Sequence, residues 1–375
     1  MRRNDRILIV GGGIAGLTTA IALRARGFDP ELIERAPAWR TEGLGITLQP
    51  NAVRLLRALG VGTQIESAGA VLRRFRYLTR DGRTLAEIDL DRMWGGHDPA
   101  INLERGTLHD VLVRALAGAR SRLGVAITSL RSGDAGVSVH FSDGGRADYD
   151  LVVGADGIGS TVRSLALGDF VPRYCGHTAL RALAPIQSSG DEEVQFWLGD
   201  GCFFGTFPVG AGRTYGAGYV LEPRDSLGVE GRLARLRERF ESFGQPVRAF
   251  FAALERDEKI HSAAVESLEL PEWRSGRVLL IGDAAHASSP MMGQGGCMAI
   301  EDAVVLAELL ETSPTVDAAL DAFTPRRRPR VDWVQAQSDA QGAAVFLPAG
   351  VRDAAIRDRG AQTFRERYAP LLAAP

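Results

Sequence analysis

The sequence has no apolar run long enough to cross a membrane. A transmembrane helix needs about 20 consecutive apolar residues, whereas the first apolar run, Ile7 to Val10, has only four. A secretory signal also needs a longer apolar region, of roughly 7 residues or more. We therefore expect no membrane span, and we interpret this first run as a short buried strand.

Cysteine is scarce, and neither sign of charge dominates. Cys175, Cys202 and Cys297 are far apart and match neither a metal-binding spacing nor a disulfide framework, so we expect a protein of the reducing cytoplasm. With 44 Lys and Arg against 46 Asp and Glu, the formal net charge is −2. This balance gives no global attraction to nucleic acid or to an anionic membrane. Small molecules are the expected partners, and we expect a monomer or a homodimer.

The chain is long enough for one large α/β domain with a smaller domain inserted in it. Segments 72–97 and 176–261 are rich in strand patterns, and we expect them to form one β-sheet domain that binds the substrate. The nucleotide-binding domain is then discontinuous. Its segments are 1–71, 98–175 and 262–340, and residues 341–375 form a C-terminal helical segment.

A glycine-rich loop lies between the first predicted strand and a predicted helix, Leu17 to Arg26. In the loop Gly11-Gly12-Gly13-Ile14-Ala15-Gly16, the first glycine of the Gly-x-Gly-x-x-Gly pattern permits a tight turn. The second lets a phosphate approach the backbone, and the third lets helix and strand pack closely. The free N–H groups at the helix N-terminus attract a pyrophosphate. We therefore predict that this loop binds a dinucleotide.

An acid ends the next predicted strand, Glu31 to Glu34. Glu34 lies about 20 residues after the loop, where an acid accepts hydrogen bonds from ribose hydroxyls. An acid here argues against a 2′-phosphate, and it therefore favours FAD or NAD over NADP.

Two further motifs combine aspartate with glycine. In "DLVVGADGIGSTVR", residues 150–163, a strand ends before Asp156-Gly157, a pair that on its own is typical of a turn. In "LLIGDAAHASSPMMGQGGCMAIEDA", residues 279–303, Asp283 closes a buried strand. That is the edge where α/β sheets bind ligands, and an acid there can accept hydrogen bonds from a polyol. The glycines that follow lead into a helix whose N-terminus would stabilise negative charge on a reduced flavin.

With these three motifs in this order, the chain resembles the class A FAD-dependent monooxygenases, the aromatic-ring hydroxylases with the p-hydroxybenzoate hydroxylase-like fold. The resemblance covers about residues 5–335. The segments "GQGGCMAIEDA" and "TPRRRPRVDWVQAQS" are most similar to small single-chain members that act on urate-, 6-hydroxynicotinate- and salicylate-type rings. Zeaxanthin-type epoxidases share these features.

The resemblance implies a Rossmann-type FAD-binding domain. In it the glycine loop and Glu34 hold the ADP half of FAD, with Arg35 beside the adenosine. Ile127 meets the adenine through its backbone, and Arg105 reaches the pyrophosphate or the ribityl chain. A surface arginine at a helix start is the alternative for Arg105.

The resemblance also assigns residues to the flavin half of the cofactor. Asp156 and Gly157 serve FAD and the nicotinamide cofactor together, and Asp283 binds the ribityl chain. Glycines form the loops that flank the isoalloxazine, namely Gly45, Gly293, Gly295 and Gly296.

The activity that the resemblance implies is a monooxygenation. NADH or NADPH binds transiently and reduces FAD, and a flavin C4a-hydroperoxide then delivers one oxygen atom of O2 to an aromatic or conjugated small molecule. The lack of a second Gly-x-Gly-x-x-Gly motif fits transient binding of the reductant. A flavin-dependent epoxidase, an oxidase or dehydrogenase on the same scaffold, and a non-catalytic flavin-binding protein are the alternatives. The Trp-x-Trp-x-Ile-Pro signature of flavin halogenases is absent.

We expect the substrate pocket between the flavin and the sheet of the second domain. The resemblance matches Tyr215 to a pocket tyrosine, with a plain sheet aromatic as the alternative. Arg181 stands where several members have a pocket aromatic. It could bind a carboxylate, with a surface strand arginine as the alternative. Further candidates, which are more often core residues when they alternate on strands, are Gln49, Phe203, Phe204 and Phe207.

Other charged and polar positions have structural interpretations. We interpret His286 as a hydrogen-bonding structural residue. We interpret the run Arg326, Arg327, Arg328 and Arg330 as packing against the nucleotide-binding domain or lying on the surface, and not as binding nucleic acid; a solvated helix start is the usual interpretation of such a run. We also predict helices over 51–59, with Asn51 as N-cap, and over 106–116, 229–254 and 297–311.

Overall fold

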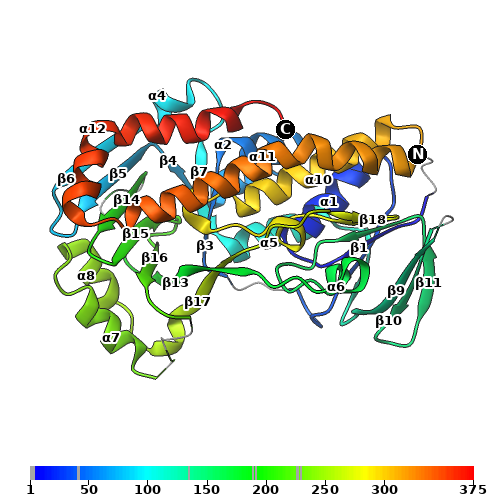
Figure 1. The fold of residues 1–375 in the computed structure, drawn as a ribbon, viewed down its shortest axis with the longest axis horizontal. Helices are drawn as coiled ribbons and strands as arrows, with labels where there is room; N and C mark the ends of the chain where they lie inside the picture. Colours follow the sequence, from blue (N-terminus) through cyan, green and yellow to red (C-terminus); the bar gives the residue numbers. More distant parts are fainter. Residues whose placement is uncertain are drawn as a thin grey trace.

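The computed structural model describes residues 5–39, 43–133, 136–187, 190, 192–224, 228 and 230–375. Within these residues the strands form a six-stranded sheet, a seven-stranded sheet and two three-stranded sheets. The two large sheets lie at different places along the long axis of the molecule (Figure 1). This mixed helix and sheet architecture confirms the predicted α/β class.

The six-stranded sheet brings the predicted motifs together. Its central strand β1 (Ile7–Val10) is fully buried and pairs in parallel with β2 (Glu31–Glu34) and β12 (Leu151–Gly154). Strands β1, β12 and β19 therefore end at one edge, although they lie far apart in the sequence. The order of the sheet is β18 (Arg274–Ser275), β19 (Val278–Leu280), β12, β1, β2 and β8 (Arg120–Leu123).

Six strands of the seven-stranded sheet come mainly from the two segments that we predicted to form the substrate domain, whereas β17 (His261–Ser267) lies almost entirely in the predicted nucleotide-binding segment 262–340. All pairs in this sheet are antiparallel except β14 with β5. The division of the chain into domains stays a prediction, and β17 places the edge of this sheet beyond the expected boundary at residue 261. The order is β17 (His261–Ser267), β13 (Arg173–Ala184), β16 (Thr214–Leu221), β15 (Cys202–Pro208), β14 (Glu193–Leu198), β5 (Arg74–Thr79) and β6 (Thr84–Asp89).

One face of this sheet packs against two short helices, α7 (Arg232–Arg239) and α8 (Gln245–Ala252). We predicted one helix over 229–254, and that prediction is wrong for the residues described there. The first helix, α7, ends at Arg239. The second helix, α8, begins after Gly244 with Pro246 in its first turn, where a proline is favoured.

Two three-stranded sheets complete the strand content. The order of one is β3 (Gly45–Leu48), β7 (Ala100–Glu104) and β4 (Ala70–Leu72), and the order of the other is β11 (Arg146–Tyr149), β10 (Gly136–Phe141) and β9 (Ile127–Gly133). The remaining short helices are α2 (Pro50–Ala58), α3 (Gly62–Ala68), α4 (Leu90–Trp94), α6 (Thr161–Leu167) and α9 (Asp283–His286).

Three predicted helices are present, with earlier starts. They are α1 (Ile14–Ala25), α5 (Arg105–Ala115) and α10 (Gly295–Thr312). In α2, by contrast, the N-cap is Gln49 and not Asn51, because Pro50 takes the first helical position. Asn51 is instead buried inside the helix.

Helices α11 (Val316–Val345) and α12 (Ala349–Tyr368) follow all the strands in the chain. The first extends along the molecule over both large sheets, and the second turns back above β6 (Figure 1). The arginine run 326–330 lies inside α11 and not at a helix start. No helix in the described part of the chain is both long and apolar enough to cross a membrane.

Candidate active site

A cavity of about 260 Å³ lies at the edge where the six-stranded sheet meets the glycine loop. It brings together residues from distant parts of the sequence that we predicted to bind FAD. These are Gly11, Gly13, Ile14, Glu34, Arg35, Arg105, Ile127, Asp156 and Gly157. We call it the cofactor cavity.

The glycines of the loop are needed for two different reasons. A Cβ on Gly11, whose φ is +112°, would lie 2.4 Å from the carbonyl oxygen of Ala155, and a Cβ on Gly16 would lie 1.9 Å from that of Gly11. Close backbone packing therefore requires both glycines. A Cβ on Gly13 would meet nothing within 4 Å. Gly13 leaves open space before helix α1, whose first turn has no acid and no side-chain cap, as a bound phosphate requires.

The loop residue Gly12 is held on two sides. Its N–H donates to Glu34 Oε2 at 2.7 Å, and its carbonyl oxygen lies 2.8 Å from His109 Nε2. The other oxygen of Glu34 accepts the N–H of Ala36 at 2.8 Å. The carboxylate thus orders the loop, and it has lone pairs left for ribose hydroxyls.

His109 and Trp39 also line the cofactor cavity, and sequence reasoning missed both. Their rings lie 5.9 Å apart, and the Trp39 ring covers Gly12 closely enough that a Cβ there would be 2.7 Å away. The position of His109, four residues after Arg105 on one face of α5, was the available signal.

The carboxylate of Asp156 accepts hydrogen bonds from two residues at the start of helix α6. It accepts the N–H of Val162 at 3.0 Å and the hydroxyl of Ser160, and it thereby caps helix α6. Gly157 follows with a φ of +81° and borders two cavities. A role for this pair in binding FAD or the nicotinamide cofactor stays a prediction.

A larger cavity of about 560 Å³ adjoins the cofactor cavity. The two share lining residues, among them Gly13, Arg105 and Gly157, so that they form one extended cleft. The larger cavity contains Ala15 of the glycine loop and the predicted flavin-side residues Gly45, Asp283, Gly293, Gly295 and Gly296. The cleft therefore has the length, the phosphate position and the polyol-binding acid that FAD requires.

Arg181 and Tyr215 meet in this larger cavity from neighbouring strands β13 and β16. The Nε atom of Arg181 is buried without a hydrogen-bond partner, and no carboxylate in the described ranges forms an ion pair with this arginine. Burial raises the pKa of the Tyr215 phenol above its ordinary value, although the charge of Arg181 acts in the opposite direction. A Cβ on Gly45 would lie 2.3 Å from the Tyr215 ring, so glycine allows this ring to pack on β3.

The strand aromatics divide between the two faces of the seven-stranded sheet. Phe203 and Phe207 line the larger cavity, as does Gln49. Phe204 lies on the opposite face, where its ring centroid is 5.1 Å from that of Phe250. The pocket prediction for Phe204 is wrong, because successive side chains of a strand point to opposite faces.

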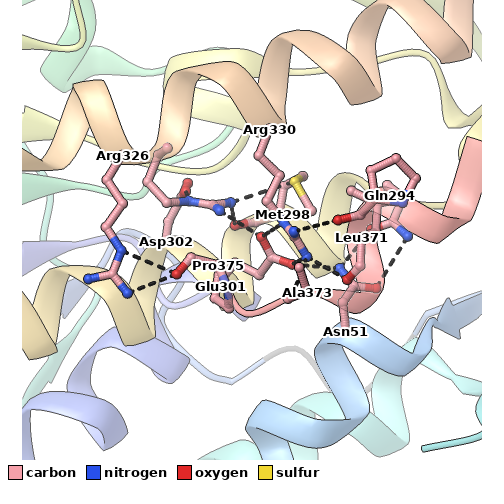
Figure 2. Close-up of polar contacts among 12 residues, drawn as sticks. Asn51, Gln294, Met298, Glu301, Asp302, Arg326, Arg330, Leu371, Ala373 and Pro375 are labelled. Atoms are coloured by element: carbon pink, nitrogen blue, oxygen red, sulfur yellow. Dashed lines mark hydrogen bonds and ion pairs between the residues drawn. The ribbon is translucent and has the colours of Figure 1, made fainter. Parts of the chain in front are cut away.

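A buried charge cluster lies behind the glycines of the flavin side (Figure 2). Asp302 on α10 accepts hydrogen bonds from His286 Nε2 at 2.7 Å and from Arg327 Nε at 2.8 Å. Burial alone would raise the pKa of the Asp302 carboxyl, but His286 and Arg327 hold this pKa well below its usual range. His286 is structural, as predicted.

Arg327 decides between the two interpretations of the arginine run. Its side chain is fully buried and also donates to Glu301 Oε2 at 2.6 Å. It is therefore not part of a solvated helix start, and the alternative, packing against the nucleotide-binding domain, is correct for this residue. Its partners are Glu301 and Asp302, two consecutive residues of α10, the helix against which α11 packs.

Glu301 connects this cluster to the residues after α12. It accepts hydrogen bonds from Asn51 Nδ2 at 2.8 Å and from Arg330 Nε at 2.7 Å. Arg330 also donates to the carbonyl oxygen of Leu371 at 2.6 Å, and Arg54 donates to that of Leu372 at 2.9 Å. The helix that begins at the flavin-side glycines is thereby tied to residues 371–373 (Figure 2).

Sequence reasoning missed a group of cavity residues from α4, β5 and α12. Tyr368 donates its hydroxyl hydrogen to the carbonyl oxygen of Met292 at 2.9 Å, beside the flavin-side glycines. The signal for α12 was the spacing of Phe364 and Tyr368, which places two rings on one helix face. The missed cavity residues include Phe75, Leu90, Trp94, Phe364 and Tyr368.

The sequence profile of the FAD binding domain family matches residues 5–181 and 249–338. The chain therefore belongs to this family, and with its relatives it is an FAD-dependent monooxygenase of the aromatic hydroxylase class.

Individual relatives cover nearly the whole chain. It is 34% identical over 335 residues to the aurachin C monooxygenase/isomerase of Stigmatella aurantiaca, covering 88% of this chain and 87% of that protein. It is 33% identical over 360 residues to a 3-amino-4-hydroxybenzoate 2-monooxygenase of Streptomyces cremeus, covering 93% and 89%. Klebsiella pneumoniae HpxO, crystallised with FAD and uric acid, matches with a TM-score of 0.91 and 27% identity over 99% of this chain and 97% of that chain.

Proposed function

We propose that this chain uses NADH or NADPH and O2 to add one oxygen atom to an aromatic molecule held by Arg181 and Tyr215. The observation that carries the proposal is the arginine without an acidic partner, in a cavity continuous with the cofactor cavity. Two relatives support it, since one is named for an aminohydroxybenzoate and the crystallised neighbour holds uric acid.

Bound FAD supplies the activation of O2, and the residues of this chain position FAD and the substrate. We assign the pyrophosphate to the N-terminus of α1 and the ribose to Glu34. Arg35 and Ile127 hold the adenosine, Arg105 the pyrophosphate or ribityl chain, and Asp283 the ribityl hydroxyls. Asp156 and Gly157 serve FAD and the reductant. The loop Gly293 to Gly296 and Gly45 flank the isoalloxazine, where the N-terminus of α10 stabilises negative charge.

Arg181 and Tyr215 then have complementary roles towards the substrate. Arg181 offers a positive charge to a phenolate or carboxylate, and a charge-assisted hydrogen bond of this kind is strong away from water. Because burial raises its pKa, Tyr215 stays protonated at neutral pH and can donate a hydrogen bond to the same group. Ionisation of a phenol makes its ring more electron-rich, which favours attack by an electrophilic oxygen.

The decisive experiment gives the FAD-loaded protein NADH or NADPH, ¹⁸O2 and a panel of phenols, hydroxybenzoates and conjugated alkenes. We expect a product that gains one ¹⁸O atom, and its structure distinguishes hydroxylation from epoxidation. Substrate turnover without label would show an oxidase or dehydrogenase. FAD binding without turnover of reductant would favour a non-catalytic flavin protein.

A pair of variants tests the role of Arg181. Arg181→Met should lower kcat/KM for ionisable substrates about 10- to 100-fold, the effect of one lost charged hydrogen bond. The control is Arg173→Met on the same strand, which removes an exposed ion pair with Asp339 and should leave kcat/KM unchanged. Equal effects of the two variants would contradict the assignment.

A further inference from the structure

The larger cavity does not end at Arg181 and Tyr215. A continuous series of aromatic rings lines it from Tyr215 to helix α4, with neighbouring centroids 4.6–6.0 Å apart. In order, the rings are Tyr215, Phe207, Phe196, Phe75, Phe364, Tyr368 and Trp94. We call the part beyond Tyr215 the aromatic chamber.

Charge and apolar surface lie at opposite sides of this cavity. Glu266 is on β17 and Arg181 is on β13, at one edge of the seven-stranded sheet. The chamber rings Phe196 and Phe75 are on β14 and β5, towards the other edge. From β13 to β5 there are four strand spacings, or about 19 Å at about 4.8 Å each. The other residues that line the chamber are also apolar, among them Leu72, Leu90, Ala100 and Val194.

Part of the chamber wall comes from outside the family match. The profile of the FAD binding domain ends at residue 338, whereas Phe364 and Tyr368 are on α12. Both side chains are buried, and Phe364 lies 5.0 Å from the Phe75 ring. Helix α12 therefore closes the cavity with rings that this chain supplies in addition to the family's core motifs.

We infer that the substrate has two unlike ends, an ionisable aromatic ring and a hydrophobic substituent of several carbons that occupies the aromatic chamber. This inference rests on the proposed function, because it takes the ring to lie at Arg181 and Tyr215. A small, fully polar ring would leave the chamber rings in contact with water, whereas an apolar substituent buries them and gains the free energy of that burial.

The test is a homologous series of 4-alkylphenols, from ethyl to octyl, titrated into the FAD-loaded enzyme and followed by the flavin absorbance. Burial of each added methylene should lower Kd about fourfold until the chamber is full. A Kd that does not change with chain length, or that rises with it, would overturn the inference.

Variants of the chamber sharpen the same measurement. Phe364→Ala should weaken octylphenol binding about tenfold or more and leave ethylphenol within about twofold. Phe364→Trp should shorten the chamber and move the tightest binding to a shorter alkyl chain. The matched control is Phe346→Ala, because this ring packs on Phe203 and His177 but does not line the cavity. It should leave the chain-length series unchanged.

The binding series also distinguishes a failure of the chamber inference from a failure of the proposed function. If long alkylphenols bind tightly but no product carries ¹⁸O, the proposed function fails and the chamber stands. If ethylphenol is hydroxylated and affinity does not rise with chain length, the chamber inference fails and the function stands. FAD content and the melting temperature of each variant show that it is folded.

Discussion

The cofactor cavity and the aromatic chamber have walls of different kinds. The cofactor cavity combines side chains with the backbone of the glycine loop, whose glycines lie where a Cβ would collide with the chain or would fill the space for a phosphate. The chamber is formed by side chains from β5, α4, β14, β15 and α12. The first can hold one cofactor common to a whole family. The second can change by single substitutions, and it is where specificity can vary.

The largest effect should come from Gly16, the glycine that packs behind the loop of the cofactor cavity. Gly16→Ala places a Cβ against the backbone oxygen of Gly11, so we expect loss of folded protein. Gly13→Ala should fold with an unchanged melting temperature and bind FAD roughly tenfold more weakly, because its Cβ takes space that a phosphate needs. Circular dichroism and FAD titration distinguish the two. A folded Gly16→Ala protein would contradict the comparison.

The next largest effect, on the free energy of unfolding, should come from the buried charge cluster of Arg327, Glu301 and Asp302. Arg327→Met leaves two buried carboxylates without their shared cation and should cost about 3–5 kcal/mol of unfolding free energy. Arg326→Met, one residue away, removes a partly exposed pair with Glu308 and hydrogen bonds to the carbonyl oxygen of Pro375 near the C-terminus, and it should cost about 1 kcal/mol or less. Urea unfolding monitors both. Similar losses for the two variants would show that burial does not decide their importance.

The pH dependence of this cluster follows from Asp302. Because its pKa is lower in the folded protein, its contribution to stability is complete above the unfolded pKa of about 4 and is lost as the pH falls below that value. Asp302→Asn should cost about 2–3 kcal/mol at pH 7, and the difference from the unmodified protein should shrink below about pH 4. A difference that stays constant down to pH 3 would contradict this.

The smallest effect should come from Tyr368 in the chamber. Tyr368→Phe removes one hydrogen bond to Met292 and keeps the ring, so the free energy of unfolding should fall by about 1 kcal/mol. The alkylphenol series should keep its slope, since the chamber wall stays apolar. A flattened slope would show that the hydroxyl, and not the ring, determines binding in the chamber.

The sequence predicted the residues of the cofactor cavity better than those of the aromatic chamber. The glycine loop, Glu34 and Asp283 could be placed at the cavities because each lies at or just after the carboxyl end of a short apolar strand that the sequence shows locally. Phe364 could not be assigned to the cavity, because α12 packs against β6, a strand that lies far earlier in the chain, and no local pattern predicts that contact. The acidic partners of Arg327 could not be predicted for a similar reason. A run of arginines is usually solvated, and only the packing of α11 on α10 gives this one its buried acids.

The position of β1 in the middle of its sheet has a consequence for biosynthesis. β12 begins at Leu151 and β19 at Val278, so this sheet is incomplete until residue 280 has been synthesised. At roughly 5–20 residues per second, the apolar strand Ile7 to Val10 waits roughly 7 to 30 seconds for its second neighbour β12, and β12 waits a similar time again for β19. Helix α12 emerges later still. During the first of these intervals the strand that will carry the cofactor loop is open to aggregation and to chaperones.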